Sequence, residues 1–212
     1  MTELRDRDLV RLYWPVEMRP AFDALLAIDD AMADVVAKAT DPTLAAIKLA
    51  WWRERLEELD HGQAPAEPRL QAALCLLIPQ GISGRELAGL EEPWAFLLHE
   101  DDQLTFMRGV TARGPRLFAL LARLLRIEMD ERLESAAHSF TASDLGRRRI
   151  TSLEPLKLGR SKTRARRAMR PLTMLEVLAR RDMRTGGPPF EPEATPRRAF
   201  ALLRHKWTGR IA

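Results

Sequence analysis

The sequence has few residues of the kinds that favour β-structure, disulfide bonds or a membrane span. Val and Ile together number 13, against 62 for Leu and Ala, and this bias favours helices over pleated sheets. A β-sandwich, a β-barrel and a doubly wound α/β fold are therefore poorly supported. The single cysteine, Cys75, excludes an internal disulfide framework and is expected to be a small buried side chain in the apolar run 72–77. No apolar run reaches the ~18–20 residues that span a bilayer.

The chain also lacks a secretory signal pattern, because charged side chains crowd residues 1–8 where a signal peptide would begin its apolar stretch. Together with the lone cysteine, this favours a cytoplasmic protein. Apolar residues make up 46% of the 212 positions, which is enough for a substantial core. We therefore expect one all-α domain, a helical bundle over residues 1–212.

Charge is distributed unevenly along the chain. Residues 1–140 carry a net charge of −8 and residues 141–212 a net charge of +12. Residues 147–170 hold ten Lys or Arg and one acid, Glu154, with weak apolar periodicity, so this segment is expected to be largely irregular. It is either a solvated arginine-rich stretch or a contact for an anionic membrane surface. Nucleic acid is an unlikely partner, because the segment has no interleaved aromatic residues for stacking.

Start and stop signals predict a series of helices. Asp41-Pro42 and Thr195-Pro196 each pair a capping side chain with a proline at the first helical position. Pro115 is expected to begin a core helix. The apolar residues at helical spacing after Pro42 predict one apolar helix face, and they are Leu44, Ile47, Trp51, Trp52, Leu56 and Leu59. The predicted helices cover 2–13, 21–39, 42–60, 68–78, 84–90, 92–107, 115–126, 127–146 and 196–207.

Acidic residues form a pattern on the predicted helix 21–39. Asp23, Asp30 and Asp34 fall on the face opposite the apolar side chains, while Asp29 falls inside the apolar face. A pair of carboxylates spaced like Asp30 and Asp34 is either a Mg²⁺ site or an ordinary wet helix face. Asp29 requires a cavity or a partner, because a lone carboxylate is costly on a core face.

The histidines and the polar run at residues 99–102 do not form a recognisable metal site or catalytic site in the sequence. The four histidines, at 61, 99, 138 and 205, are scattered, so neither a zinc site nor a Cys–His nucleophile is supported. The polar run from His99 to Asp102 is expected to end one helix or cap the next.

Several segments are similar to those of one known family. They are Asp6-Arg7-Asp8, residues 20–28 (Pro-Ala-Phe-Asp-Ala-Leu-Leu-Ala-Ile), Trp51-Trp52-Arg53-Glu54, residues 114–125, and the tail from Leu178-Ala179-Arg180-Arg181-Asp182 through Pro196-Arg197. In these motifs the chain resembles the squalene/phytoene synthase family, mostly its short, divergent bacterial members. The resemblance covers most of the chain and is specific in the first third.

The resemblance implies an all-α isoprenoid synthase fold, here truncated in its second half because several tens of residues are missing after about residue 150. Active members join two prenyl diphosphates head to head, using Mg²⁺ held by two aspartate-rich motifs on facing helices. Alignment of residues 25–28 places the first motif at Ala33 and Ala37. In the second, Asp144 would be the first aspartate, but Arg148 stands four residues later and cannot ligate Mg²⁺.

Two functions follow from this resemblance. The favoured one is a degenerate member that has lost prenyl transfer and acts as a binding or assembly protein with a protein partner. The same superfamily includes a similar branch that acts in assembly of respiratory complex I. The alternative is an active transferase acting on a prenyl diphosphate. A rebuilt Mg²⁺ site would then use Asp30, Asp34 and Asp144, with Arg53, Arg147 and Arg148 contacting diphosphate or another polyanion. A lipidic substrate would suit a protein peripheral to the inner face of the membrane.

Overall fold

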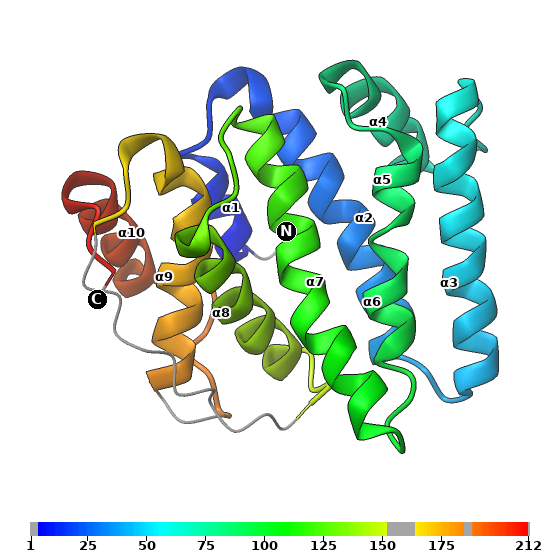
Figure 1. The fold of residues 1–212 in the computed structure, drawn as a ribbon. Coiled ribbons are helices and arrows are strands. Elements are labelled where there is room, and N and C mark those ends of the chain that lie inside the picture. The colour runs from blue at the N-terminus through cyan, green and yellow to red at the C-terminus, as the bar shows by residue number, and fades with distance from the viewer. Residues whose placement is uncertain (1–3, 152–163, 185–187, 212) are drawn as a thin grey trace.

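The structure is a computed structural model that describes residues 4–151, 164–184 and 188–211. Within these ranges the chain forms helices and no strand, so the all-α prediction is confirmed (Figure 1). The first part of the chain forms α1 (Asp6–Arg11), η1 (Val16–Met18), α2 (Arg19–Ala37), α3 (Pro42–Glu57), η2 (Glu58–His61), α4 (Pro68–Leu76), η3 (Ile78–Gln80) and α5 (Gly84–Ala88). It continues with α6 (Glu91–Phe96), α7 (Gln103–Leu124), α8 (Glu131–Arg147), η4 (Arg167–Met169), α9 (Arg170–Arg184) and α10 (Pro196–Thr208).

The long helices pack in a row. α3 forms one edge of the molecule and α10 the opposite edge, with α7 and α8 between them (Figure 1). α8 packs against α7 on one side and α9 on the other, and α9 packs against α10. α2 contacts α3, α4, α6 and α7, while α1 lies against α9 and α10. Buried apolar side chains form one continuous core from Val10 in α1 to Leu202 in α10.

Local signals place several helix starts where they were predicted. The Asp41 carboxylate accepts hydrogen bonds from the backbone N–H groups of Thr43 (2.8 Å) and Leu44 (3.4 Å), and α3 begins at Pro42. Thr195 accepts one from Arg198 (3.3 Å) and α10 begins at Pro196. These side chains satisfy backbone donors that have no partner inside the helix.

The predictions for residues 92–126 were wrong in their boundaries. A single helix over 92–107 was expected, but α6 ends at Phe96 and α7 begins at Gln103, where Asp102 caps it as foreseen for the polar run before it. Pro115 lies inside α7 instead of beginning a helix. A proline in a helix interior removes a hydrogen bond, and the tertiary packing of Leu117 and Phe118, both fully buried, outweighs this cost.

Two further expectations about burial need correction. Of the six apolar residues predicted to share one helix face, Trp52, Leu56 and Leu59 are buried. Leu44, Ile47 and Trp51 are exposed, because α3 lies at the edge of the bundle. Cys75 is also exposed, on the outer side of α4. Apolar spacing identifies the helix, but it does not identify which stripe has a neighbour to pack against.

The basic segment 147–170 falls into parts with different surroundings. Residues 152–163 lie outside the described ranges. Arg147 and Arg148, at the end of α8, contact carboxylates inside the bundle. Residues 164–169 lie beside α10, where the Ala165 N–H donates to the Gly209 carbonyl at 2.8 Å. α9 follows at Arg170, where no helix was predicted.

None of the helices within the described residues has both the length and the hydropathy needed to cross a membrane.

Gly114 sets the distance between α7 and α8. A Cβ atom at this position would overlap the carbonyl oxygen of Ala137 and the hydroxyl of Thr141 on α8. Backbone atoms cannot rotate away as a side chain can, so the two helices would have to separate. The close approach therefore requires glycine here.

We expect Gly114→Ala to lower the free energy of unfolding by about 1 to 3 kcal/mol, because the added methyl group overpacks the α7–α8 interface. Urea denaturation followed by circular dichroism measures this change. Gly89→Ala is the matched control, since its Cβ would lie 3.3 Å from the Glu86 carbonyl oxygen and needs only a small shift. Equal stability of the two variants would contradict the role assigned to Gly114.

Candidate functional site

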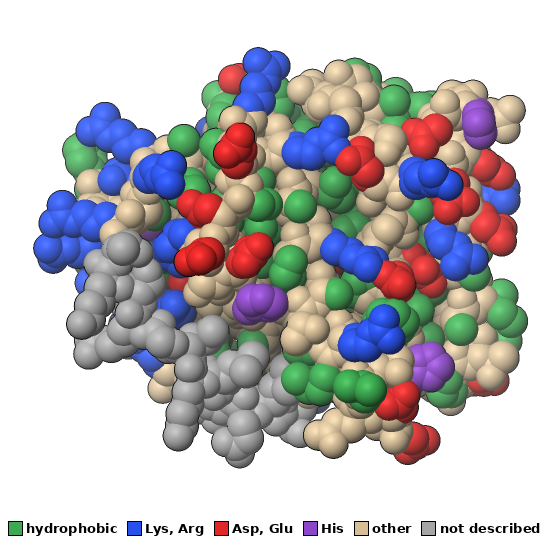
Figure 2. Space-filling view, in the orientation of Figure 1, with side chains coloured by type: hydrophobic (Ala, Val, Ile, Leu, Met, Phe, Trp, Pro, Cys, Tyr) green, Lys and Arg blue, Asp and Glu red, His purple; other side chains and the backbone are tan. Residues whose placement is uncertain are grey.

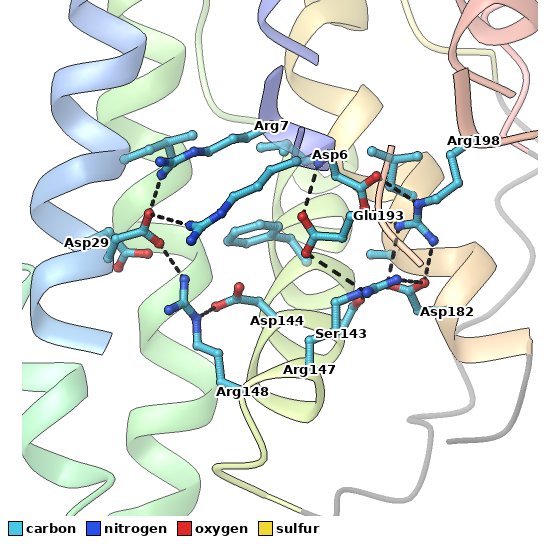
Figure 3. Close-up of a pocket in the computed structure, with 17 residues that line it drawn as sticks. Asp6, Arg7, Asp29, Ser143, Asp144, Arg147, Arg148, Asp182, Glu193 and Arg198 are labelled. Atoms are coloured by element: carbon cyan, nitrogen blue, oxygen red, sulfur yellow. Dashed lines mark hydrogen bonds and ion pairs between the residues drawn. The ribbon is translucent and has the colours of Figure 1, made fainter. Parts of the chain in front are cut away.

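A small polar cavity lies where α1, α2, α8, α9 and α10 meet (Figure 3). Its volume is about 110 Å³, room for a few water molecules. Charged residues dominate its lining, with a few apolar side chains from α2, α8 and α9. The charged residues are Arg5, Asp6, Arg7, Asp29, Asp30, Asp144, Arg147, Arg148, Asp182, Glu193 and Arg198.

Asp29 and Arg113 form a buried ion pair beside this cavity. Both residues are at most 2% exposed, and the Arg113 Nη2 donates to Asp29 Oδ2 at 2.6 Å. The other Asp29 oxygen accepts from Trp94 Nε1 at 2.9 Å. The Arg113 guanidinium also lies over the Trp94 ring, 4.2 Å from its centroid. Asp29 thus has the partner that its place on an apolar face required.

A chain of ion pairs connects Asp29 and Arg113 to two further carboxylates, Asp144 and Asp30. Arg113 Nη2 lies 2.8 Å from Asp144 on α8, and Asp144 also accepts from Arg148 Nε at 2.9 Å. Arg148 then reaches across to α2, where its Nη2 donates to Asp30 at 2.5 Å. Asp30 accepts a further hydrogen bond from Arg7 of α1. Positive and negative groups therefore alternate from α7 through α8 and α2 to α1.

A second cluster, centred on Asp182 of α9, borders the same cavity. Asp182 is 1% exposed and accepts from Ser143 Oγ at 2.7 Å. Arg147 donates to both of its carboxylate oxygens at 2.6 Å, and Arg198 Nη1 donates at 2.6 Å. Arg198 also holds Asp6 of α1, through its Nε at 2.8 Å. The cluster ties α8, α9, α10 and α1 together.

The protonation of these carboxyls follows from their surroundings. Burial raises the pKa of Asp29, and Arg113 only partly offsets it. Burial also acts to raise the pKa of Asp144, but Arg113 and Arg148 together outweigh it and hold that pKa below its usual value. Burial disfavours the charge of Arg148, yet Asp144 and Asp30 outweigh it and raise its pKa. Asp144 and Arg148 are thus a charged pair at neutral pH.

The structure brings together four of the six residues singled out from the sequence. Asp30, Asp144, Arg147 and Arg148 all line the cavity. Asp34 does not, since it lies on the exposed face of α2 and pairs with Lys38 at 2.9 Å. Arg53 is also elsewhere, half exposed on α3 with Glu91 3.9 Å away. Whether any of these residues binds a metal or a diphosphate remains a prediction.

The donor set around the cavity does not suit a divalent cation such as Mg²⁺. Arg148 already occupies the space between Asp30 and Asp144, and a guanidinium has no acceptor atom with which to ligate a metal. Within the described residues, no three His, Cys, Asp or Glu side chains are grouped so that they could hold a metal ion. Ala33 and Ala37, the aligned positions of the first motif, carry no ligating atom.

Arg113, Asp182 and Arg198 also belong to the site, although they were not predicted from the sequence. Each is a charged residue on the inward face of its helix. Arg113 falls in register with Leu117, and Arg198 with Leu202, both fully buried. The signal that marked Asp29, a charge inside an apolar stripe, was therefore present at these positions as well.

Comparison with known proteins gives one match. A family model described as squalene/phytoene synthase matches residues 3–108, half of the chain. No curated protein matches the chain, and no solved structure does. The matched range includes Asp6, Asp29 and Asp30, whereas Asp144 and Asp182 lie beyond it.

We expect Arg113→Met to lower the free energy of unfolding by about 3 to 5 kcal/mol at neutral pH, because Asp29 would be left as an uncompensated buried charge. The pKa of Asp29 is already raised and would rise further. The folded state would then hold a proton that the unfolded chain has released, so stability would fall with rising pH. Urea unfolding should show a smaller loss at about pH 5.5 than at about pH 7.5.

The control is Asp29→Asn combined with Arg113→Met, which keeps an acceptor for Trp94 and removes the titrating group. This double variant should be more stable than Arg113→Met alone at neutral pH. The pH difference should become smaller, with the rest coming from Asp144, which also loses Arg113. If Arg113→Met lowered the free energy of unfolding equally at both pH values, Arg113 would not be the partner that keeps the Asp29 carboxylate charged.

Proposed function

Because the chain belongs to the squalene/phytoene synthase family, we propose that it is a degenerate member, one that no longer transfers prenyl groups and acts by binding a partner. The observation that carries this proposal is the position of Arg148. Its guanidinium lies between Asp30 of α2 and Asp144 of α8, at 2.5 and 2.9 Å from their oxygens. The guanidinium of Arg148 thus occupies the position between Asp30 and Asp144 in which a Mg²⁺ ion would otherwise bind.

Electrostatics supports this reading. The positive charge that the carboxylates need is already supplied, and Mg²⁺ would have to displace a guanidinium held by two charge-assisted hydrogen bonds. If Arg148 stayed nearby, repulsion from the metal would cost several kcal/mol, by Coulomb's law at about 4 Å and an effective dielectric of about 20. Loss of the metal site would remove the group that neutralises a departing diphosphate in active members.

The size and lining of the cavity point the same way. Pockets for small molecules enclose roughly 300 to 1,000 Å³ and are lined mainly by apolar side chains. This cavity measures about 110 Å³, and Arg, Asp and Glu supply most of its lining residues. Prenyl chains are long and apolar, so two of them would not fit here without a large rearrangement of α2, α8 and α9.

A binding role is supported by the exposed stripe on α3. Leu44, Ile47 and Trp51 are 56%, 61% and 40% exposed and recur about one helical turn apart at the edge of the bundle. Contiguous exposed apolar side chains are typical of surfaces that contact another protein. Selection for a partner surface would preserve the scaffold while the metal ligands were lost.

We expect no pyrophosphate release above background when the purified chain is given farnesyl or geranylgeranyl diphosphate with Mg²⁺. A coupled colorimetric assay for pyrophosphate measures this. Asp34→Ala and Asp144→Asn should leave the signal at background. Release by the wild type that is lost in Asp144→Asn would instead establish the alternative, an active prenyl-diphosphate transferase.

A second experiment asks whether Arg148 is what excludes the metal. We expect Mg²⁺ to leave the melting temperature of the wild type unchanged. It should raise that of Arg148→Asp, where a third carboxylate would join Asp30 and Asp144. At a Mg²⁺ concentration about 100 times the dissociation constant, binding would raise the free energy of unfolding of this variant by about 2.7 kcal/mol.

Arg148→Gln is the control for this experiment, since it removes the cation without adding a carboxylate. It should respond to Mg²⁺ less than Arg148→Asp does. A rise in the melting temperature of the wild type at the same Mg²⁺ concentration would overturn the proposed loss of the metal site.

A further inference from the structure

α10 presents an apolar strip to solvent at the edge of the bundle. Phe200 is 67% exposed, Leu203 43% and Trp207 76%. At about 100° per residue, these three side chains lie within about 60° of one another around the helix axis. The opposite face is firmly anchored, since Arg198, Leu202 and His205 are fully buried. The strip is therefore a fixed feature of a packed helix.

Cations flank this strip on both sides. By the same helical geometry, Arg197 and Arg204 lie on one side of it and Lys206 on the other. All three are exposed, and α10 contains no Asp or Glu. An apolar strip between rows of Lys and Arg is the pattern of a helix that lies in the interface of a membrane, with Trp at the level of the headgroups.

A basic groove lies beside the C-terminal part of α10, between it and the start of α9. Arg167, Arg170 and Lys206 line it together with Tyr13 and Trp207, and its lining includes no acidic residue. The groove is held in place because Arg170 Nη1 donates to the Lys206 carbonyl at 2.7 Å. Figure 2 shows Lys and Arg gathered over this edge of the molecule, whereas acidic and basic side chains mix over the opposite half of the same face.

The acidic residues from α9 to the start of α10 do not neutralise the positive charge on the outer face of α10. Glu176 is fully buried between Arg132 and Arg180, and Asp182 is held by Arg147 and Arg198. Glu191 pairs with Arg181 at 2.8 Å, and Glu193 lies 3.9 Å from Arg147. The carboxylates thus face arginines inside the bundle and beside it, which leaves the outer face of α10 positive.

We propose that the outer face of α10 and the adjoining basic groove dock the protein on a membrane surface rich in anionic phospholipid. Phe200, Leu203 and Trp207 enter the headgroup region, and the flanking Arg and Lys side chains contact lipid phosphates. A lipid surface fits better than nucleic acid, because a polyanion without an apolar layer would leave the strip in water. The proposal does not depend on whether prenyl diphosphates are turned over.

Co-sedimentation of the full chain with vesicles tests this surface. Binding is expected to an equal mixture of phosphatidylglycerol and phosphatidylcholine, to be much weaker with phosphatidylcholine alone, and to weaken as salt is added. Phe200→Ser with Trp207→Ser should lower the vesicle affinity roughly tenfold or more. Arg204→Gln with Lys206→Gln should also lower it roughly tenfold or more, because each cation near an anionic surface contributes to the affinity.

Leu44→Ser with Trp51→Ser is the matched control, because it removes two exposed apolar side chains from the opposite edge. It should bind vesicles like the wild type, and circular dichroism should show every variant folded. Three results would overturn the proposal: no binding to anionic vesicles, equal binding to neutral ones, or an equal loss in the α3 control. Binding to duplex DNA as tight as to vesicles, unchanged in Phe200→Ser with Trp207→Ser, would indicate a general polyanion surface instead.

Discussion

Asp29 lies near the centre of the bundle, 2% exposed, and Arg113 meets it from α7 at 2.6 Å. A carboxylate in this position is tolerated only with such a partner, since the desolvation of an unpaired charge would cost more than the core around it could offset. Arg113 in turn contacts Asp144, which contacts Arg148, which contacts Asp30. This alternation of charge links α1, α2, α7 and α8 across the bundle.

The same contacts that link the helices also fill the space between facing carboxylates on α2 and α8. In an active member, facing carboxylates would be held apart until a metal and a diphosphate joined them. Here Arg148 and Arg147 extend from the end of α8 and satisfy carboxylates on α2 and α9. Buried ion pairs often contribute little net stability, but removal of one partner is costly. Loss of any one of these charged residues would therefore be costly, because it would leave its buried partner unpaired.

The two edges of the molecule carry exposed apolar side chains, whereas the cavity is lined largely by charged residues. α3 and α10 each carry an exposed apolar strip, at opposite edges of the row of helices. Mixed charges accompany the strip on α3, among them Lys48 and Glu54, whereas only cations accompany the strip on α10. Contact with a protein on one edge and with a lipid surface on the other would suit a member of this family that works by binding.

Local chemistry in the sequence determined where α3 and α10 begin, because the caps at Asp41 and Thr195 act on backbone groups two or three residues away. It also determined that Asp29 needed a partner. Only the tertiary structure decided that the partner is Arg113, that Arg148 reaches Asp30, and that Leu44, Ile47 and Trp51 face solvent. A periodic stripe records that a face is apolar, while burial and pairing depend on which distant helix lies against it. Arg148 and Asp30 are 118 residues apart, and nothing in the spacing of either carries that contact.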